Sequence, residues 1–300
     1  MLRNLCKITI LFLLFNSAKA SAKEMQLLSA KDIFNIRYNK AENRIFYGKD
    51  KYQFGDLRLP DSQVTGPIPV LIIIHGGCWL SKFANIDFMS PFAESMTKSG
   101  IATWNIEYRP VDIEGGGWPG TFNDVSNAID LIRKLAPQYN LDLNKIVVLG
   151  HSAGGHLALW AAARNKLKIS DQLYQKNPLK LLAAINLSGP ASLRDFLKIE
   201  EQACGCKIIE KLLGIKDAEN QDRYLQSSPD EMLPLGIKQI LITGKNDEAA
   251  PASMMENYKK KASSFGDDVE IIILDGGHFE LIAPETADFQ KVKDKILSIF

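Results

Sequence analysis

The chain has 300 residues, of which 46% are hydrophobic, and it carries 36 basic against 35 acidic residues. A chain of this length and composition can bury one large core, and α/β folds of this size usually form a single domain. The formal net charge of +1 offers little attraction for nucleic acid or for an anionic membrane surface, so neither is predicted as a partner.

The first 20 residues have the composition of an export signal. Arg3 and Lys7 supply a positive start, residues 8–15 form an apolar run, and Ala18-Lys19-Ala20 offers a cleavage site between small residues. The apolar run is shorter than the roughly 20 residues that a membrane-spanning helix needs. We therefore predict a signal peptide at 1–20 and an exported mature protein, periplasmic or secreted, with no membrane association after cleavage.

Three cysteines remain after residue 20, and an odd number cannot pair completely within one chain. A disulfide framework is therefore not expected to hold the fold. Cys204 and Cys206 could form a local disulfide in an oxidising compartment, although a ring closed over one residue is strained. No second cysteine pair and no histidine lies near them in sequence to complete a tetrahedral site, so no metal is predicted there.

Apolar, β-branched runs alternate with helical patterns along the chain, as expected for a parallel sheet covered on both faces. In chain order, we predict antiparallel strands at 44–47 and 56–59, then a strand at 70–75, a helix at 89–98, a strand at 101–107, a helix at 122–135, a strand at 145–149, a helix at 153–164, strands at 182–188 and 239–243, a helix at 252–264, a strand at 269–274 and a helix at 286–299. The predicted fold class is α/β, with a mostly parallel central sheet.

Residues 192–231 break this alternation. They contain a short helical fragment at 208–213 and turn signals at 217–220 and 227–229. A segment of about 40 residues cannot easily enclose a core of its own. We interpret it as a cap-like insertion in a single domain of residues 21–300, and expect it to cover the functional site.

Residues 150–154 read Gly-His-Ser-Ala-Gly and match the pattern G-x-S-x-G. The bare pattern should occur by chance in about one chain in ten of this length. Here it follows the predicted strand at 145–149 and opens a predicted helix, which is the context that a nucleophile elbow requires. We predict Ser152 as a nucleophile; the alternative is a glycine-rich turn capped by a serine.

A serine hydroxyl is a poor nucleophile until a base takes its proton. Of the four histidines, His75, His151 and His156 lie in or beside glycine motifs, on the wrong sides of the strand ends to reach the serine hydroxyl. His278 remains, just past the predicted strand at 269–274, and we predict it as the base. The alternative is a histidine of a surface loop.

The third member of such a site is a carboxylate that orients the imidazole and stabilises its cation. Asp247 follows the predicted strand at 239–243 and precedes Pro251, which gives the chain order Ser, Asp, His of α/β-hydrolases. Glu248 is the direct rival and Asp275 a more distant one. Asp247 could also simply cap a turn.

Acyl transfer also needs hydrogen-bond donors for the developing oxyanion. Residues 75–79 read His-Gly-Gly-Cys-Trp after the predicted strand, so backbone without side chains at Gly76 and Gly77 can approach a substrate carbonyl. The backbone N–H of Ala153 would be the other donor. The alternative for the glycines is a tight turn.

Together, the His-Gly-Gly-x-Trp segment, the Gly-His-Ser-Ala-Gly-Gly-His elbow, Asp247 and His278 resemble the esterase and lipase branch of the α/β-hydrolases. The resemblance runs from about Arg58 to the C-terminus, and in detail the chain is similar to small exported carboxylesterases and to kynurenine formamidase-like enzymes. It implies the α/β-hydrolase fold, Ser152, Asp247 and His278 as a triad, and an oxyanion hole shaped by Gly76, Gly77 and Ala153. No cofactor or metal is implied.

We predict that three residues border the substrate pocket: Cys78, Trp79 and Trp118. Cys78 stands where larger residues are frequent in the resembling enzymes, between Gly77 and Trp79, and it is either a packed small side chain or a reactive thiol. Trp118 follows three glycines between a strand and a helix. It is equally well explained as the aromatic anchor of a flexible loop.

The leading functional prediction is hydrolysis of carboxylic esters of small substrates through an acyl-enzyme intermediate. Arylformamide hydrolysis uses the same machinery and is the alternative. An exported prolyl-oligopeptidase-like peptidase lacks the chain length for a propeller, and a non-catalytic binding module would typically lack one of the three triad residues.

Overall fold

The computed structural model describes residues 26–61, 66–215 and 221–300. The predicted signal peptide and the turn signal at 217–220 lie outside the described residues. Within them, one eight-stranded sheet has the order β1-β2-β4-β3-β5-β6-β7-β8. Its strands are β1 (Asn43–Phe46), β2 (Phe54–Arg58), β3 (Ile68–Ile74), β4 (Ala102–Ile106), β5 (Leu141–His151), β6 (Ala183–Leu187), β7 (Lys238–Gly244) and β8 (Val269–Leu274).

Only the β1–β2 and β2–β4 pairs of this sheet are antiparallel; from β4 to β8 all neighbours run parallel. The register brings the carboxyl ends of the parallel strands level, because Ile74 pairs with Gly150 and Gly244 with Leu274. The loops after β3, β5, β7 and β8 therefore leave the sheet at one edge. In open α/β sheets, such an edge is where ligands bind.

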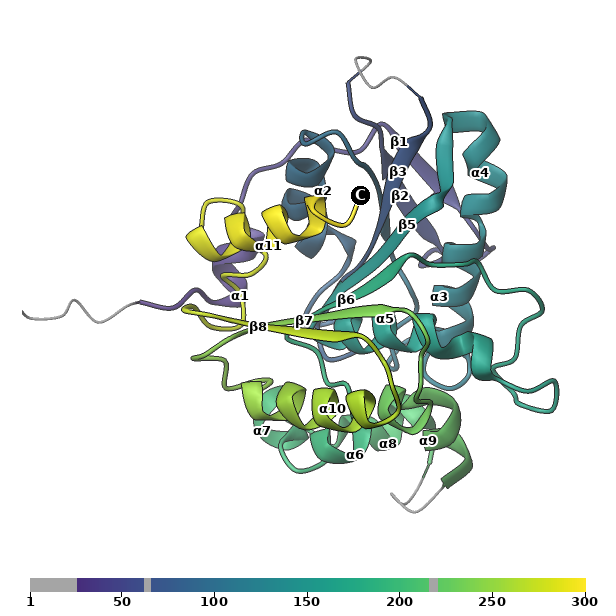
Figure 1. The fold of residues 1–300 in the computed structure, drawn as a ribbon, viewed down its shortest axis with the longest axis vertical. Helices are drawn as coiled ribbons and strands as arrows, with labels where there is room; N and C mark the ends of the chain where they lie inside the picture. The colour runs from purple at the N-terminus through teal and green to yellow at the C-terminus, as the bar shows by residue number, and fades with distance from the viewer. Residues whose placement is uncertain (1–25, 62–65, 216–220) are drawn as a thin grey trace, which may run out of the picture.

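Helices cover both faces of the sheet (Figure 1). They are α1 (Ala30–Phe34), α2 (Ser90–Thr97), α3 (Gly120–Asp130), α4 (Ile132–Tyr139), α5 (Ala153–Ala163), α6 (Leu193–Phe196), α7 (Glu200–Cys204), α8 (Ile208–Leu213), α9 (Gln221–Ser227), α10 (Ala252–Ser264) and α11 (Ala287–Leu297). None of the helices described is long and apolar enough to cross a membrane.

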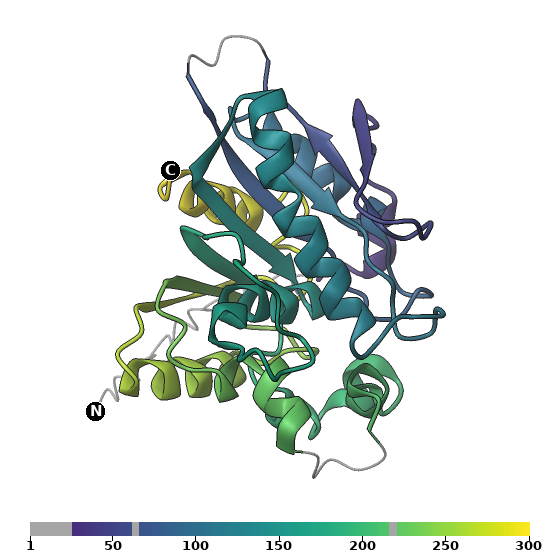
Figure 2. The same cartoon turned by 90° about the vertical axis from the view of Figure 1, so that its right-hand side faces the viewer.

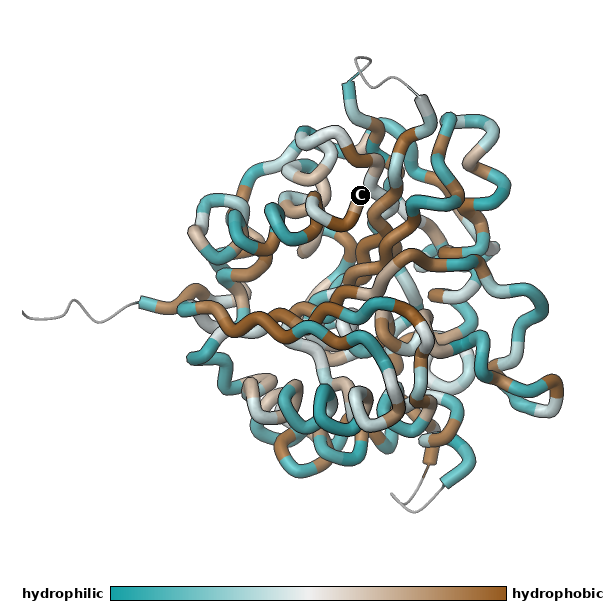
Figure 3. The backbone as a smooth tube through the Cα atoms, viewed as in Figure 1, coloured by the Kyte–Doolittle hydropathy of each residue, from teal (hydrophilic) through white to brown (hydrophobic). Residues whose placement is uncertain are grey.

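The core has two parts because alternate residues of each strand face opposite sides of the sheet. On β3, Val70, Ile72 and Ile74 pack with α3, α4, α5, α10 and the insertion, whereas Leu71 and Ile73 pack with α1, α2 and α11. The central strands are accordingly apolar along their length, and the outer helices are mixed (Figure 3). This pattern is the one expected for a sheet that is buried on both faces.

The predicted elements match the observed ones closely, with one strand (269–274) and two helices (208–213 and 252–264) sharing their bounds with β8, α8 and α10. The prediction differs at 122–135, where the structure has two helices, α3 and α4, which meet at Leu131. Neither glycine nor proline stands at that junction, so the sequence carries no local signal for it.

The insertion at 192–231 contains α6 to α9 and a short 3₁₀ turn at Pro229–Glu231. In the two views at right angles, these helices lie together beside one end of the sheet (Figures 1 and 2). Their apolar residues, such as Phe196, Leu212 and Tyr224, join the core formed by α3, α5 and α10. The described part of the insertion thus packs on the core that α3, α5 and α10 also form.

The cysteine pairing differs from the local disulfide that the sequence left open. Cys204 is bonded to Cys78, which lies 126 residues away, and not to Cys206. Cys206 is the free cysteine of the described residues, as an odd count requires. A pairing over this distance depends on how the insertion packs against the loop after β3, and sequence spacing does not reveal it.

Candidate active site

Ser152 occupies a sharp turn between β5 and α5, with φ 54° and ψ −122°. A positive φ is rare for a residue with a side chain and costs of order 1–3 kcal/mol. The backbone N–H of Ser152 donates to Leu187 O on β6 at 2.8 Å, which holds the turn. A Cβ at Gly150 would lie 1.9 Å from the carbonyl oxygen of Gly154, so the turn closes only over glycine.

His278 and Asp247 meet in the loops after β8 and β7. The imidazole Nδ1 of His278 lies 2.7 Å from Oδ2 of Asp247. The other carboxylate oxygen accepts the N–H groups of Ala249 and Ala250, each at 2.9 Å. Burial raises the pKa of Asp247, but hydrogen bonds and the charge of His278 outweigh it and leave the pKa below its ordinary value. Asp247 is therefore a buried, ionised acceptor for His278.

The two rival carboxylates lie elsewhere. Glu248 is exposed, and Asp275 is exposed and forms an ion pair with Lys245 at 2.9 Å. The geometry thus brings Asp247 to the imidazole and leaves both rivals in solvent.

Ser152 and His278 line the same pocket, which has a volume of about 140 Å³. Pockets for drug-sized ligands are larger, roughly 300–1,000 Å³. Most of the lining is apolar: Ala30, Gly77, Cys78, Phe83, Ala84, Phe88, His151, Phe196, Ala203, Cys204, Ala249 and Phe279 complete it. The space beside the serine and the imidazole suits a small, apolar group.

The residues predicted to shape an oxyanion hole lie beside Ser152. A Cβ at Gly76 would lie 2.9 Å from the Cβ of Ser152, so the backbone after β3 passes directly against this serine. Gly77 lines the pocket with φ +97°. Ala153 is the first residue of α5, where N–H groups have no partner within the helix and the helix dipole is positive.

A buried polar cluster fixes the start of this loop. His75 contacts Glu107 through Nε2 at 2.8 Å, and the second carboxylate oxygen of Glu107 accepts the N–H of Ile86 at 2.9 Å. The hydroxyl of Tyr108 donates to His75 O at 3.0 Å, and the rings of His75 and Tyr108 stack. Tyr108 and His75 therefore support the loop from behind rather than face the pocket.

Side chains of His151, Glu280 and Asp288 hold the loop that carries His278. Nε2 of His151 donates to His278 O at 2.9 Å, Glu280 accepts the N–H of Gly277 at 2.8 Å, and Asp288 accepts the N–H of Gly276 at 2.6 Å. Burial, with a smaller effect of His278, lowers the pKa of His151 to about 3. His151 is thus a neutral donor that holds the His278 loop.

Two residues predicted at the pocket lie outside its lining. Trp79 is fully buried and packs edge-on against His156 and Phe196. Trp118 contacts Phe122 and donates to Gln172 at 2.6 Å. Cys78 does line the pocket, as half of a disulfide.

The sequence model of the BD-FAE family matches residues 56–261. This match spans more than half of the chain. The chain belongs to the BD-FAE family. It is also 33% identical over 132 residues, 44% of its length, to esterase LipC of Mycobacterium tuberculosis, of which it covers 31%.

Solved esterase structures share the fold of this BD-FAE member. Esterase B of Lactobacillus rhamnosis superposes with a TM-score of 0.74 at 19% identity, covering 90% of each chain. Esterase Est2 of Thermogutta terrifontis, solved with propionate bound, gives a TM-score of 0.69 at 19% identity and covers 85% of this chain and 92% of the other. The fold is the α/β-hydrolase fold.

Several pocket residues of this BD-FAE member were missed by the sequence reasoning. Phe83 and Phe88 come from the segment between β3 and α2, Phe279 follows His278, and Ala30 comes from α1, which was not predicted. Only Phe279 had a sequence signal, its place next to the predicted base. No cluster of three or more metal-ligating residues occurs in the part of the chain that the structure describes.

Proposed function

We propose that this protein is an esterase that hydrolyses small carboxylic esters through an acyl-enzyme, with Ser152, His278 and Asp247 as its triad. The observation that carries the proposal is the 2.7 Å contact between His278 and Asp247 beside a pocket that both His278 and Ser152 line. The esterase names of the relative and of the structural neighbours support it.

In the first step, Oγ of Ser152 attacks the ester carbonyl carbon while Nε2 of His278 takes the hydroxyl proton. The N–H groups of Gly77 and Ala153 face the developing oxyanion. The tetrahedral intermediate then expels the alcohol, which receives the proton from His278. Water, deprotonated by the same imidazole, attacks the acyl-enzyme and releases the acid, and Ser152 regains its proton.

The dimensions of the pocket favour short acyl groups. Its volume of about 140 Å³ and the bulk of Phe83, Phe88 and Phe196 leave room for few carbon atoms. The neighbouring esterase Est2 holds propionate, which is a small acid of this kind. Arylformamides remain the second candidate, because a formyl group is smaller still and its hydrolysis needs the same residues.

The test is a rate panel on the protein without residues 1–20. It contains p-nitrophenyl acetate, butyrate, hexanoate and decanoate, acetylated xylan fragments, N-formylkynurenine and a prolyl peptide. Acetate and butyrate should be hydrolysed fastest, and Ser152→Ala should lower kcat by about 10⁴-fold or more at unchanged thermal stability. Full activity in Ser152→Ala would overturn the proposal, and a preference for N-formylkynurenine would favour the formamidase.

Export of the mature protein is a further part of the proposal. The apolar run at 8–15 supports it, and so does the disulfide between Cys78 and Cys204, since disulfides persist mainly in oxidising compartments. Fractionation of expressing cells, with N-terminal sequencing of the mature protein, should find it outside the cytoplasm and beginning near Ser21. Recovery from the cytoplasm with an intact N-terminus would contradict it.

A further inference from the structure

The loop that carries the proposed oxyanion donors has an unusual backbone. Three consecutive residues have positive φ: Gly77 at +97°, Cys78 at +52° and Trp79 at +53°. Glycine adopts this region freely, but a residue with a Cβ is strained there. Gly77 is moreover packed against Ala84, where a Cβ would come within 2.7 Å. Such a loop keeps its shape only if its surroundings hold it there.

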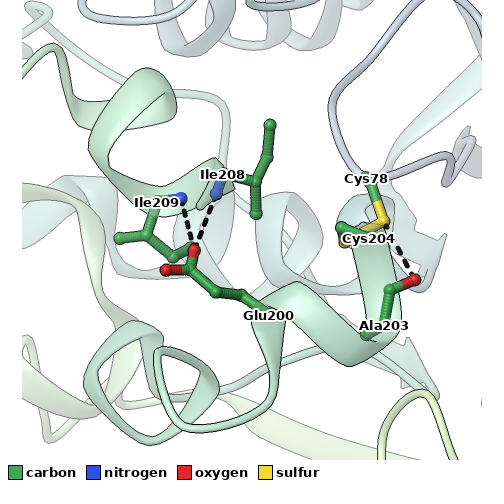
Figure 4. The surroundings of a disulfide bond; sticks show 6 residues. All are labelled: Cys78, Glu200, Ala203, Cys204, Ile208 and Ile209. Atoms are coloured by element: carbon green, nitrogen blue, oxygen red, sulfur yellow. Dashed lines mark hydrogen bonds between the residues drawn. A yellow bond between two sulfur atoms is a disulfide. The ribbon is translucent and has the colours of Figure 1, made fainter. Parts of the chain in front are cut away.

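Contacts with the insertion hold the loop in this conformation. Cys78, in the centre of the three residues, is bonded to Cys204 at the end of α7 (Figure 4). Sγ of Cys78 also lies 3.8 Å from Ala203 O; because a disulfide sulfur carries no hydrogen, this is a close contact. The next residue, Trp79, packs edge-on against Phe196 of α6. Two adjacent residues of the loop are thus tied to two helices of the insertion.

The other end of the disulfide is itself fixed. Cys204 is buried, and the helix that carries it begins at Glu200, which is also buried. One carboxylate oxygen of Glu200 accepts the N–H groups of Ile208 and Ile209 at the start of α8, both at 2.8 Å (Figure 4). The side chains of Ile208 and Ile209 lie in the core. The disulfide therefore joins the loop to a braced pair of helices and not to a free segment.

The disulfide also borders the pocket. Cys78, Cys204 and Ala203 line it together with Ser152 and His278. Ala203 and Cys204, with Phe196, form the side of the pocket that the insertion provides, and Cys78 joins this side from the loop after β3. Any acyl group bound at Ser152 is limited on that side by the bonded sulfurs and by the ends of α6 and α7.

We propose that the Cys78–Cys204 disulfide is a positioning and specificity element of the active site: it holds the oxyanion loop against the insertion and closes one wall of the acyl pocket. This inference rests on the proposed esterase function. It predicts that the oxidised protein is fully active with a narrow acyl range. When the disulfide is opened, the loop loses its fixed donors and the wall can move outward.

The first experiment removes the bond by substitution. Cys78→Ser/Cys204→Ser is compared with wild type and with Cys206→Ser, which removes the free cysteine two residues from the bond. One oxyanion donor is worth about 10²–10³ in kcat, so a loosened loop should lower kcat for p-nitrophenyl acetate about tenfold. The ratio of acetate to hexanoate kcat/KM should fall about threefold or more, whereas Cys206→Ser keeps both values.

A purely structural bond would lower the melting temperature and leave kcat and the acyl ratio within twofold at a temperature where the variant is folded. That result would overturn the proposal.

The second experiment does not depend on a variant that folds. Cys206→Ser protein without residues 1–20, in which no third thiol can exchange into the Cys78–Cys204 bond, is treated with dithiothreitol. Two electrons and two protons pass to the bond, the S–S bond breaks into two thiols, and dithiothreitol closes to its cyclic disulfide. With the far-ultraviolet circular dichroism unchanged, kcat and the acyl ratio should shift as in the double variant and return on reoxidation. Activity that does not change while thiol titration shows two new thiols would overturn the proposal.

A readout that is independent of the natural substrate separates this inference from the proposed function. The rate at which a fluorophosphonate labels Ser152 depends on the nucleophile and the oxyanion donors, not on the acyl preference. If oxidised wild-type protein is not labelled, the proposed function fails. If it is labelled, and the rate is the same with the disulfide open, only the present inference fails.

Discussion

The site depends on single residues in unusual conformations. Ser152 has a positive φ that Gly150 and Gly154 permit by leaving out side chains. The strain costs stability. The hydrogen bond from Ser152 N–H to Leu187 O on the neighbouring strand β6 helps to hold the residue in this conformation. A serine in relaxed strand geometry would have its hydroxyl on one face of the sheet rather than above its edge.

Asp247 is the residue whose role is tested most simply. Asp247→Asn keeps the size of the side chain but removes the charge that orients His278 and stabilises its cation, so kcat should fall about 10³–10⁴-fold. Glu248→Gln, on the exposed neighbour, should stay within twofold. Steady-state kinetics on p-nitrophenyl acetate decide between the two carboxylates. An inactive Glu248→Gln together with an active Asp247→Asn would assign the role to Glu248.

The charge of Asp247 also contributes to stability. Its pKa is lower in the fold than the ordinary value of 3.8, so the fold favours the ionised form. This contribution is present above about pH 4 and is lost as the pH falls through the lowered pKa. The difference in unfolding free energy between wild type and Asp247→Asn, measured with urea, should shrink below about pH 4. A difference that grows at acid pH would contradict this account.

His151 should act through the loop of His278. His151→Phe keeps a ring but removes the hydrogen bond to His278 O, and one such bond is worth about 1 kcal/mol. We expect kcat to fall about fivefold to tenfold. His156→Phe is the matched control, because it removes a buried hydrogen bond to Ser227 O away from that loop. Equal loss of kcat in both variants would show a general effect on stability instead.

At the scale of elements, one buried carboxylate braces two helices of the insertion. Glu200 links α7 to α8, and burial raises its pKa. Glu200→Ala leaves two buried N–H groups without their acceptor and should lower the free energy of unfolding by about 2–3 kcal/mol. Glu201→Ala, on the exposed neighbour, should change it by less than about 0.5 kcal/mol. Urea unfolding of both variants measures the difference, and equal effects would remove Glu200 from its bracing role.

The strands and most helices could be predicted because their apolar residues repeat with the period of each element. The same signal placed Ser152, Asp247 and His278 after the predicted strands at 145–149, 239–243 and 269–274. What periodicity does not carry is contact between distant segments. The bond from Cys78 to Cys204 and the place of Ala30 in the pocket depend on how loops and short helices pack. Sequence position also misled the prediction for Trp79. Gly77 and Cys78 of the same motif line the pocket, but the ring of Trp79 is buried in the core.

At the scale of the whole molecule, two buried histidines tie stability to pH. Burial lowers the pKa of His151 to about 3 and that of His156 to about 4, from an ordinary value of 6.5. Below that value, the unfolded chain binds protons that the folded chain does not. Stability therefore falls as the pH falls from about 6.5, by up to about 1.4 kcal/mol per pH unit for each histidine.

Urea unfolding between about pH 5 and 6.5 tests this slope. His156→Phe should remove the contribution of one histidine to this pH dependence. The unfolding free energy of the variant should therefore fall less steeply with decreasing pH than that of wild type. The absolute stability of the variant does not enter, because only the slope is compared. Identical slopes in the two proteins would contradict the burial of a neutral His156.

The central claim is that one serine at the edge of the sheet forms a covalent acyl-enzyme. It is tested most directly by intact-protein and peptide mass spectrometry after reaction with a fluorophosphonate. We expect a single adduct, located on the peptide that contains Ser152, and no adduct on Ser152→Ala. An adduct on another residue, or an unlabelled protein under conditions where a control serine hydrolase is fully labelled, would contradict it.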